Sequence, residues 1–139
     1  GPRQRPDMAF HRFLRALSNG APIELYGDGE QTRDFTFVED AVTATVAAGR
    51  TGVPGRVYNI GGGSRVSINH VLEVMANVAD RRPTIRRQHA QRGDMRDTFA
   101  ETTRAHADLG FVPSVTLEKG IQAEYQWLAT SLTPESQPV

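Results

Sequence analysis

The apolar residues of this chain follow two different spacings, which alternate along the sequence. Over residues 10–17, and again over residues 68–79, they recur at the 3.6-residue period of amphipathic helices. Short runs of β-branched, aromatic or alternating residues, typical of strands, lie at residues 23–26, 35–38, 56–60 and 84–88. This alternation of helix and strand predicts an α/β fold.

Residues with strong capping preferences indicate where the helices begin and end. Asp7 is the expected N-cap of the first helix, and Gly20 is its expected C-cap. Ser67 and Thr116 stand where they can cap two later helices, and Gly110 stands where a short helix should end. Elements of this length with short connections predict a compact unit.

Two glycine-rich segments separate the expected elements. Residues 27–29, Gly-Asp-Gly, predict a turn with positive φ angles, and residues 61–63 are three glycines after the strand expected at 56–60. A dinucleotide-binding G-x-G-x-x-G that begins at Gly61 would need glycine at position 66, which is Val66. A tight connection from strand to helix is therefore favoured over a dinucleotide loop.

The acids and histidines have structural interpretations. Glu39 and Asp40 precede a small-residue helix expected over 41–49, where negative charge stabilises the positive end of the helix dipole. His11 and His70 lie on helices beside polar neighbours, and we expect both at the solvated surface. The histidine spacing does not match a zinc-binding pattern, so no metal site is expected.

The composition fits a single domain. The chain has 139 residues, 38% of them hydrophobic, which is sufficient for one core. Its 16 basic and 16 acidic residues balance, which argues against a nucleic-acid-binding or membrane-surface protein. It has no cysteine and no apolar run of about 18 residues, so neither thiol chemistry nor a membrane span is expected. We expect one domain over residues 1–130 and a flexible tail over residues 131–139.

Nearly all of the basic residues are arginines, and several lie between regular elements. Arg3, Arg5, Arg33 and Arg92 stand beside turn residues rather than on helix faces. A guanidinium group matches two oxygens of a phosphate or a carboxylate at once, so such arginines favour an anionic ligand. A loop arginine that is only solvated is the alternative for each of them.

Six stretches carry a resemblance to a known family. They are GPRQRPDMAF at 1–10, YGDGEQTRDFTFV at 26–38, VYNIGGG at 57–63, RGD at 92–94, LGFVP at 109–113 and the helix over 120–127. In this order they resemble the C-terminal, substrate-binding part of NAD-dependent nucleotide-sugar epimerases of the extended short-chain dehydrogenase/reductase family. Together they cover nearly the whole chain.

The resemblance implies a Rossmann-type α/β protein of which this chain is the C-terminal part. It would form a small mixed sugar-binding lobe, plus one strand and helices that pack on the NAD domain. NAD would be bound mainly by an N-terminal part, with Pro2 as the one candidate contact in this chain. The family's catalytic Tyr-x-x-x-Lys cannot occur here, because Lys119 is the only lysine and Val115 stands four residues before it. We therefore expect this isomerase segment to have no catalytic residue and to be inactive alone.

Residues 5–9, Arg-Pro-Asp-Met-Ala, resemble the version of this motif in UDP-glucuronate 4-epimerases. The resemblance implies that Arg5 faces the C6 carboxylate of the sugar. The implied reaction removes the C4 hydride to NAD, rotates the keto sugar and returns the hydride to its opposite face. UDP-galactose 4-epimerase, UDP-glucuronate decarboxylase and dTDP-hexose dehydratase stay open as alternatives. A truncated, non-catalytic module that binds UDP-sugars stays open as well.

The resemblance also implies the other substrate-binding residues. Arg33 matches an arginine that binds the diphosphate, and Tyr26 matches an aromatic residue beside the uracil. Phe35 replaces a tyrosine that is frequent in the family, so only packing is expected of it. Asp94 matches a carboxylate that accepts hydrogen bonds from the ribose hydroxyls. Arg92 stands one residue away from a phosphate-binding arginine of some relatives, and we include it as a candidate.

The expected partners follow from the same resemblance. They are a UDP-sugar and the N-terminal NAD-binding part of the same enzyme, against which the helix over 41–49 and the strand over 56–60 would pack. Without that part the chain exposes apolar surface, so a homodimer is a further candidate. Neither nucleic acid nor a membrane is expected as a partner. A cytoplasmic location is expected, because nucleotide sugars are made there.

Overall fold

The computed structural model describes residues 1–90, 93 and 95–132. These residues form a mixed α/β structure, which confirms the predicted fold class. In chain order, the helices and strands are α1 (Ala9–Asn19), β1 (Ile23–Tyr26), β2 (Thr32–Asp34), α2 (Val38–Thr51), β3 (Arg65–Ser67), α3 (Ile68–Ala79), β4 (Ile85–Gln88), α4 (Thr103–Leu109) and α5 (Leu117–Leu132).

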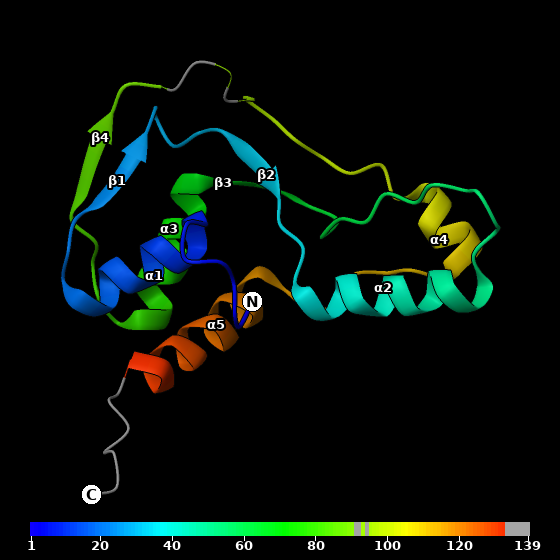
Figure 1. Ribbon diagram of the computed structural model, residues 1–139. Coiled ribbons are helices and arrows are strands. Elements are labelled where there is room, and N and C mark those ends of the chain that lie inside the picture. Colours follow the sequence, from blue (N-terminus) through cyan, green and yellow to red (C-terminus); the bar gives the residue numbers. More distant parts are fainter. Residues whose placement is uncertain (91–92, 94, 133–139) are drawn as a thin grey trace, which may run out of the picture.

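The main body consists of α1, α3 and α5, packed beside a two-stranded parallel sheet of β1 and β4 (Figure 1). β1 lies on the core side and buries Ile23 and Leu25, whereas all four residues of β4 are exposed. The strand predicted at 84–88 is thus confirmed as β4. The largest fully buried side chains of the body come from all three helices and β1: Leu14, Ile23, Val71, Met75, Ile121, Glu124 and Leu128.

A smaller unit of α2 and α4 extends from the main body (Figure 1). Its core is small, with Ala44 from α2 packed against Ala105 and Phe111. The antiparallel pair of β2 and β3 lies where the two parts meet.

Asp40 fastens the start of α2 to the segment that enters α5. Its side chain is only 3% exposed. One carboxylate oxygen accepts the backbone N–H and the hydroxyl of Ser114 at 3.0 and 2.8 Å, and the other accepts the N–H of Val115 at 3.2 Å. A buried carboxylate is stable only when it is hydrogen-bonded in this way. The acid predicted to favour a helix N-terminus therefore also connects two helices.

Most of the predicted caps and turns are confirmed. Gly20 and Gly110 end α1 and α4 with left-handed φ angles of 67° and 64°. The hydroxyls of Ser67 and Thr116 accept backbone N–H groups three residues later, at 3.2 and 3.4 Å. In the turn over residues 27–29, both glycines have positive φ, 77° and 79°. These features depend on local geometry, which the sequence specifies directly.

The cap predicted for α1 is wrong. Asp7 forms an exposed ion pair with Arg5 at 3.1 Å, and Met8 occupies the N-cap position without a side-chain cap. Instead, the side-chain oxygen of Gln4 accepts the backbone N–H of His11 at 2.9 Å. A residue from the preceding segment thus satisfies a free donor in the first turn of the helix.

The strand predicted over residues 35–38 is also wrong. The strand β2 ends at Asp34, and Val38 already begins α2. Phe35 packs edge-to-face against Phe10 of α1, with 4.7 Å between the ring centroids. Its apolar character therefore serves a contact with a helix rather than a sheet.

Residues 56–60 do not form the predicted strand, because no described strand lies beside them to pair with. Val57 is 73% exposed. The segment is held instead by the hydroxyl of Tyr58, which donates to Asp108 at 3.0 Å, and by Arg56, which pairs with the same carboxylate at 2.7 Å. Residues 61–63 were also predicted to connect a strand directly to a helix. This is wrong, because β3 lies between them and α3.

Replacing Asp108 with asparagine is expected to lower stability more at pH 7 than at pH 3. The guanidinium of Arg56, and then the hydroxyl of Tyr58, keep the pKa of Asp108 below its ordinary value. A lowered folded-state pKa adds stability above the unfolded pKa of about 3.9, and this is lost as the pH falls through the folded value. Urea unfolding at both pH values measures the difference between the two proteins. A difference that does not change with pH would contradict the prediction.

His11 is buried, so its predicted surface position is wrong. Its side chain is 7% exposed, and its ring lies 6.0 Å from that of Trp127 on α5. α1 packs against α5 as well as α3, so a helix face that looks polar in sequence is covered. His70 is exposed, as predicted.

Residues 133–139 of the predicted tail lie outside the described residues, and α5 reaches Leu132. Among the described helices, none is both long enough and apolar enough to cross a membrane.

Candidate functional site

An open groove of about 590 Å³ lies between the first turns of α1 and the ends of β1 and β2. This volume is within the range of roughly 300–1,000 Å³ that is usual for small-molecule sites. Three of the residues predicted to bind substrate line it together: Tyr26 at the end of β1, Arg33 in β2 and Phe35 just after β2. They are up to nine residues apart, and the turn that follows β1 brings them to one surface.

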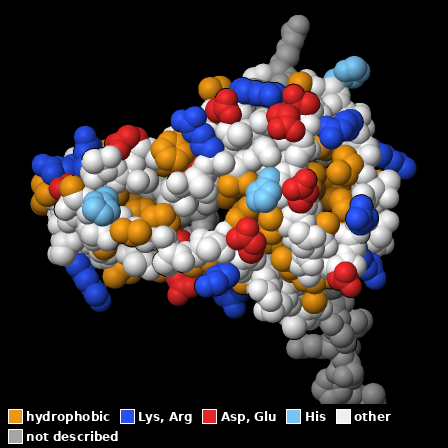
Figure 2. Space-filling model, turned by 180° about the vertical axis from the view of Figure 1, so that it is seen from behind, with side chains coloured by type: hydrophobic (Ala, Val, Ile, Leu, Met, Phe, Trp, Pro, Cys, Tyr) orange, Lys and Arg blue, Asp and Glu red, His pale blue; other side chains and the backbone are white. Residues whose placement is uncertain are grey.

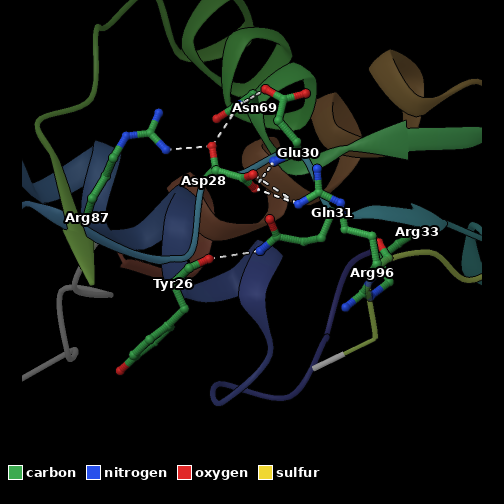
Figure 3. A network of polar contacts seen from close by, with 8 residues as sticks. All are labelled: Tyr26, Asp28, Glu30, Gln31, Arg33, Asn69, Arg87 and Arg96. Atoms are coloured by element: carbon green, nitrogen blue, oxygen red, sulfur yellow. Dashed lines mark hydrogen bonds and ion pairs between the residues drawn. The ribbon is translucent and has the colours of Figure 1, made fainter. Parts of the chain in front are cut away.

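Tyr26 presents its ring from a fixed backbone. Its side chain points away from the neighbouring polar network (Figure 3), and the residue is 37% exposed. Its carbonyl oxygen accepts a hydrogen bond of 2.9 Å from the side chain of Gln31, which also lines the groove. An exposed aromatic ring on a held backbone can stack on a planar ligand.

Arg33 is half-buried on the neighbouring strand. Its guanidinium donates to the carbonyl of Thr32 at 2.7 Å and to the carbonyl of Arg96 at 3.4 Å. These two carbonyl acceptors orient the group. A cation held in this way at a groove is suited to a phosphate or carboxylate ligand.

The turn between Tyr26 and Arg33 is held by a network of polar contacts (Figure 3). Asp28 accepts the N–H of Glu30 at 2.9 Å and binds the guanidinium of Arg96 through both carboxylate oxygens, at 3.1 and 3.0 Å. The N–H of Glu30, and then Arg96, lower the pKa of the Asp28 carboxyl below its ordinary value. Asp28 thus stays ionised and paired at neutral pH.

The chain is similar in sequence and in structure to known proteins. Residues 1–61 match the NAD dependent epimerase/dehydratase family. The structure resembles UDP-glucuronic acid 4-epimerase of Bacillus cereus, solved with UDP-glucuronic acid and NAD, with a TM-score of 0.90 and 37% identity. That match covers 94% of this chain and 42% of the other. Over these shares the chain is similar to NAD-dependent epimerases and dehydratases.

Two further proteins show the same relation. MoeE5, solved with UDP-glucuronic acid and NAD, has a TM-score of 0.90 and 41% identity over 95% of this chain and 44% of its own. The uncharacterized UDP-glucose epimerase YtcB of Bacillus subtilis is 34% identical over 94% of this chain and 42% of its own length. This chain spans about two fifths of the length of these relatives and corresponds to their C-terminal part, as predicted.

The remaining predicted site residues do not line the groove among the described residues. Arg5 is not among its lining residues; its side chain is 74% exposed and pairs with Asp7, which does line the groove. Pro2 lies in the segment before α1 and does not line it either. Arg92 and Asp94 lie outside the described residues.

The sequence did not point to two arginines near the groove. Arg12 lines it from the exposed side of α1, one residue before the buried Phe13. Arg96 contacts Asp28 across 68 residues of chain. The helical period alone could have placed Arg12 on the outer face of its helix. No local pattern could have paired Arg96 with a turn so distant in sequence.

Proposed function

We propose that this chain is the nucleotide-sugar-binding part of an NAD-dependent 4-epimerase that acts on UDP-glucuronate. The observation that supports this most directly is the convergence of Tyr26, Arg33 and Phe35 on one groove. The ring of Tyr26 stacks on the uracil, and the guanidinium of Arg33 binds the diphosphate. Phe35 contributes an apolar wall that is held by Phe10.

Arg5 is assigned to the C6 carboxylate of the sugar. It is exposed and stands next to the groove, and its only partners among the described residues are Asp7 and the sulfur of Met8. A sugar carboxylate would replace Asp7 as its partner, with the same charge-assisted hydrogen bonds. Arg92 and Asp94 keep their predicted roles at the phosphate and the ribose. The crystallised relatives contain UDP-glucuronic acid, and MoeE5 is also solved with UDP-glucose.

NAD binding is assigned mainly to the part of the enzyme outside this chain. A Cβ atom at Gly62 would lie 1.9 Å from the carbonyl oxygen of Phe35, so this glycine serves close packing. After Gly63 the chain enters β3, so the glycines do not lead into a helix N-terminus that could face a pyrophosphate. Residues 61–63 therefore do not form a dinucleotide cradle. The contribution of the described residues is to hold and orient the sugar nucleotide.

The outer face of α2 is assigned to contact with that NAD-binding part. Val38, Val42 and Val46 recur every four residues on this helix and are 48%, 55% and 46% exposed. Figure 2 shows apolar side chains on both parts of the molecule, between charges of both signs. Val57 is a further exposed apolar side chain, and residues 56–60 have no strand partner among the described residues, which a strand of that part would supply. A homodimer stays a prediction.

Titration calorimetry with UDP-glucuronate and UDP-glucose tests the substrate assignment, because the two ligands differ only at C6. We expect UDP-glucuronate to bind about 10- to 100-fold more tightly, as a hydrogen bond to a charged group adds roughly 1.5–3 kcal/mol. Arg5→Ala should remove this preference and leave the affinity for UDP unchanged. Arg50→Ala, on the distant end of α2, is the control. Equal binding of both sugars by the unsubstituted protein would contradict the assignment.

A further inference from the structure

Arg96 contacts both elements that carry the groove's binding residues (Figure 3). Its carbonyl oxygen accepts the backbone N–H of Thr32 at 2.9 Å and the guanidinium of Arg33 at 3.4 Å. Its own guanidinium binds Asp28, two residues after Tyr26, through both carboxylate oxygens at 3.1 and 3.0 Å. One residue therefore connects β2 to the turn that follows β1.

The turn that receives Arg96 is itself anchored on two further sides. The carbonyl oxygen of Asp28 accepts hydrogen bonds from the side chains of Asn69 on α3, at 3.1 Å, and Arg87 on β4, at 2.6 Å. A Cβ atom at Gly29 would lie 2.1 Å from the side-chain oxygen of Asn69, so the turn approaches α3 closely. The turn is thus a fixed point against which Arg96 can hold β2.

The segment around Arg96 also pairs with β2 through its backbone. The N–H of Thr98 donates to the carbonyl of Thr32 at 3.2 Å, and the hydroxyl of Thr32 donates to Asp97 at 2.5 Å. This pairing alone is one residue wide. The ion pair to Asp28 adds a side-chain contact to this narrow backbone pairing.

We propose that Arg96 is a positioning residue, which fixes β2 relative to the Tyr26 turn and so sets the spacing of Tyr26 and Arg33 before a ligand binds. The ligand expected at these residues, a nucleoside diphosphate, rests on the proposed function. The contacts of Arg96 with β2 and with Asp28, which we call the clamp, do not depend on it. Arg96 acts through other residues because the Nη1 atom of its guanidinium already binds both carboxylate oxygens of Asp28. Arranging the binding groups in advance lowers the entropy lost on binding.

Amide hydrogen exchange, measured by NMR on the ligand-free chain, tests the clamp directly. Arg96→Met should speed exchange at the N–H groups of Thr32 and Thr98 about fivefold, the upper effect of an exposed ion pair. Asp28→Asn should do the same, since it keeps an acceptor for the N–H of Glu30 and loses only the charge. Arg96→Lys should stay close to the unsubstituted chain. Arg82→Met is the control.

Arg82 is a suitable control because it is exposed, and its guanidinium has no hydrogen bond or ion pair with any other described residue. Its substitution removes the same charge without touching the clamp. The combined variant Arg96→Met/Asp28→Asn should be no worse than either single variant, because both changes remove one shared interaction.

UDP binding, measured by calorimetry on the same variants, tests the consequence. Arg96→Met and Asp28→Asn should each weaken it about three- to fivefold, in step with their exchange rates. Unchanged exchange in both variants would overturn the proposal. Loss of UDP binding with unchanged exchange would overturn it too, because Arg96 would then contact the ligand itself. If the unsubstituted chain does not bind UDP, the proposed function fails, and the exchange rates alone decide the clamp.

Discussion

Arg33→Met is expected to weaken UDP binding about a hundredfold. The proposed diphosphate ligand would lose a charge-assisted hydrogen-bonding partner, and two such bonds at roughly 1.5 kcal/mol each correspond to that factor. Methionine keeps most of the apolar length of the side chain, so packing in the groove changes little. Titration calorimetry with UDP measures the loss.

Uridine separates this prediction from a general disturbance of the groove. Uridine has no phosphate, so its affinity should be the same in both proteins. Arg33→Lys should give an intermediate loss for UDP, because an ammonium keeps the charge without the planar fork. Arg15→Met, an exposed residue of α1 that does not line the groove, should change neither affinity. An equal loss for uridine and UDP would mean that Arg33 acts through structure and not through phosphate binding.

Gly62→Ala is expected to destabilise the fold by about 2–4 kcal/mol. The added Cβ atom would lie 1.9 Å from the carbonyl oxygen of Phe35, which is backbone and cannot simply rotate away. The same glycine donates its N–H to Asp34 at 2.7 Å, so a shift would also break this hydrogen bond. Because Phe35 lines the groove, UDP affinity should fall together with stability. Urea unfolding measures the first effect.

Gly49→Ala is the matched control for that substitution. Gly49 lies inside α2, and a Cβ atom there would meet nothing within 4 Å. Alanine is the better helix former, so stability should rise by about 0.5–1 kcal/mol. If Gly62→Ala behaved like Gly49→Ala, the close approach between Gly62 and Phe35 would not be a constraint on this fold.

Local features of the fold could be predicted from the sequence because a few adjacent residues specify them. The C-caps at Gly20 and Gly110, the N-cap at Ser67 and the positive φ angles around Asp28 each depend on backbone geometry within about four residues. The buried face of α3 follows from its helical period in the same way.

Features that depend on a partner could not be predicted in this way. The segments at 35–38 and 56–60 have strand-like composition, but a strand exists only where another strand pairs with it. His11 looks solvated until α5 covers it. The sequence also offered Asp7 as a cap with no sign that Gln4 would take that role.

In the candidate site, too, some features could be predicted from the sequence and others could not. The types of group present, an aromatic ring at Tyr26 and a guanidinium at Arg33, were evident from the sequence and from the family it resembles. Their meeting on one groove, and the bond between Arg96 and Asp28 that holds the groove's two sides, were decided by the tertiary structure. Local sequence determines backbone geometry and the chemistry of each side chain. Contacts across 68 residues depend on how all the helices and strands pack, which no short stretch of sequence encodes.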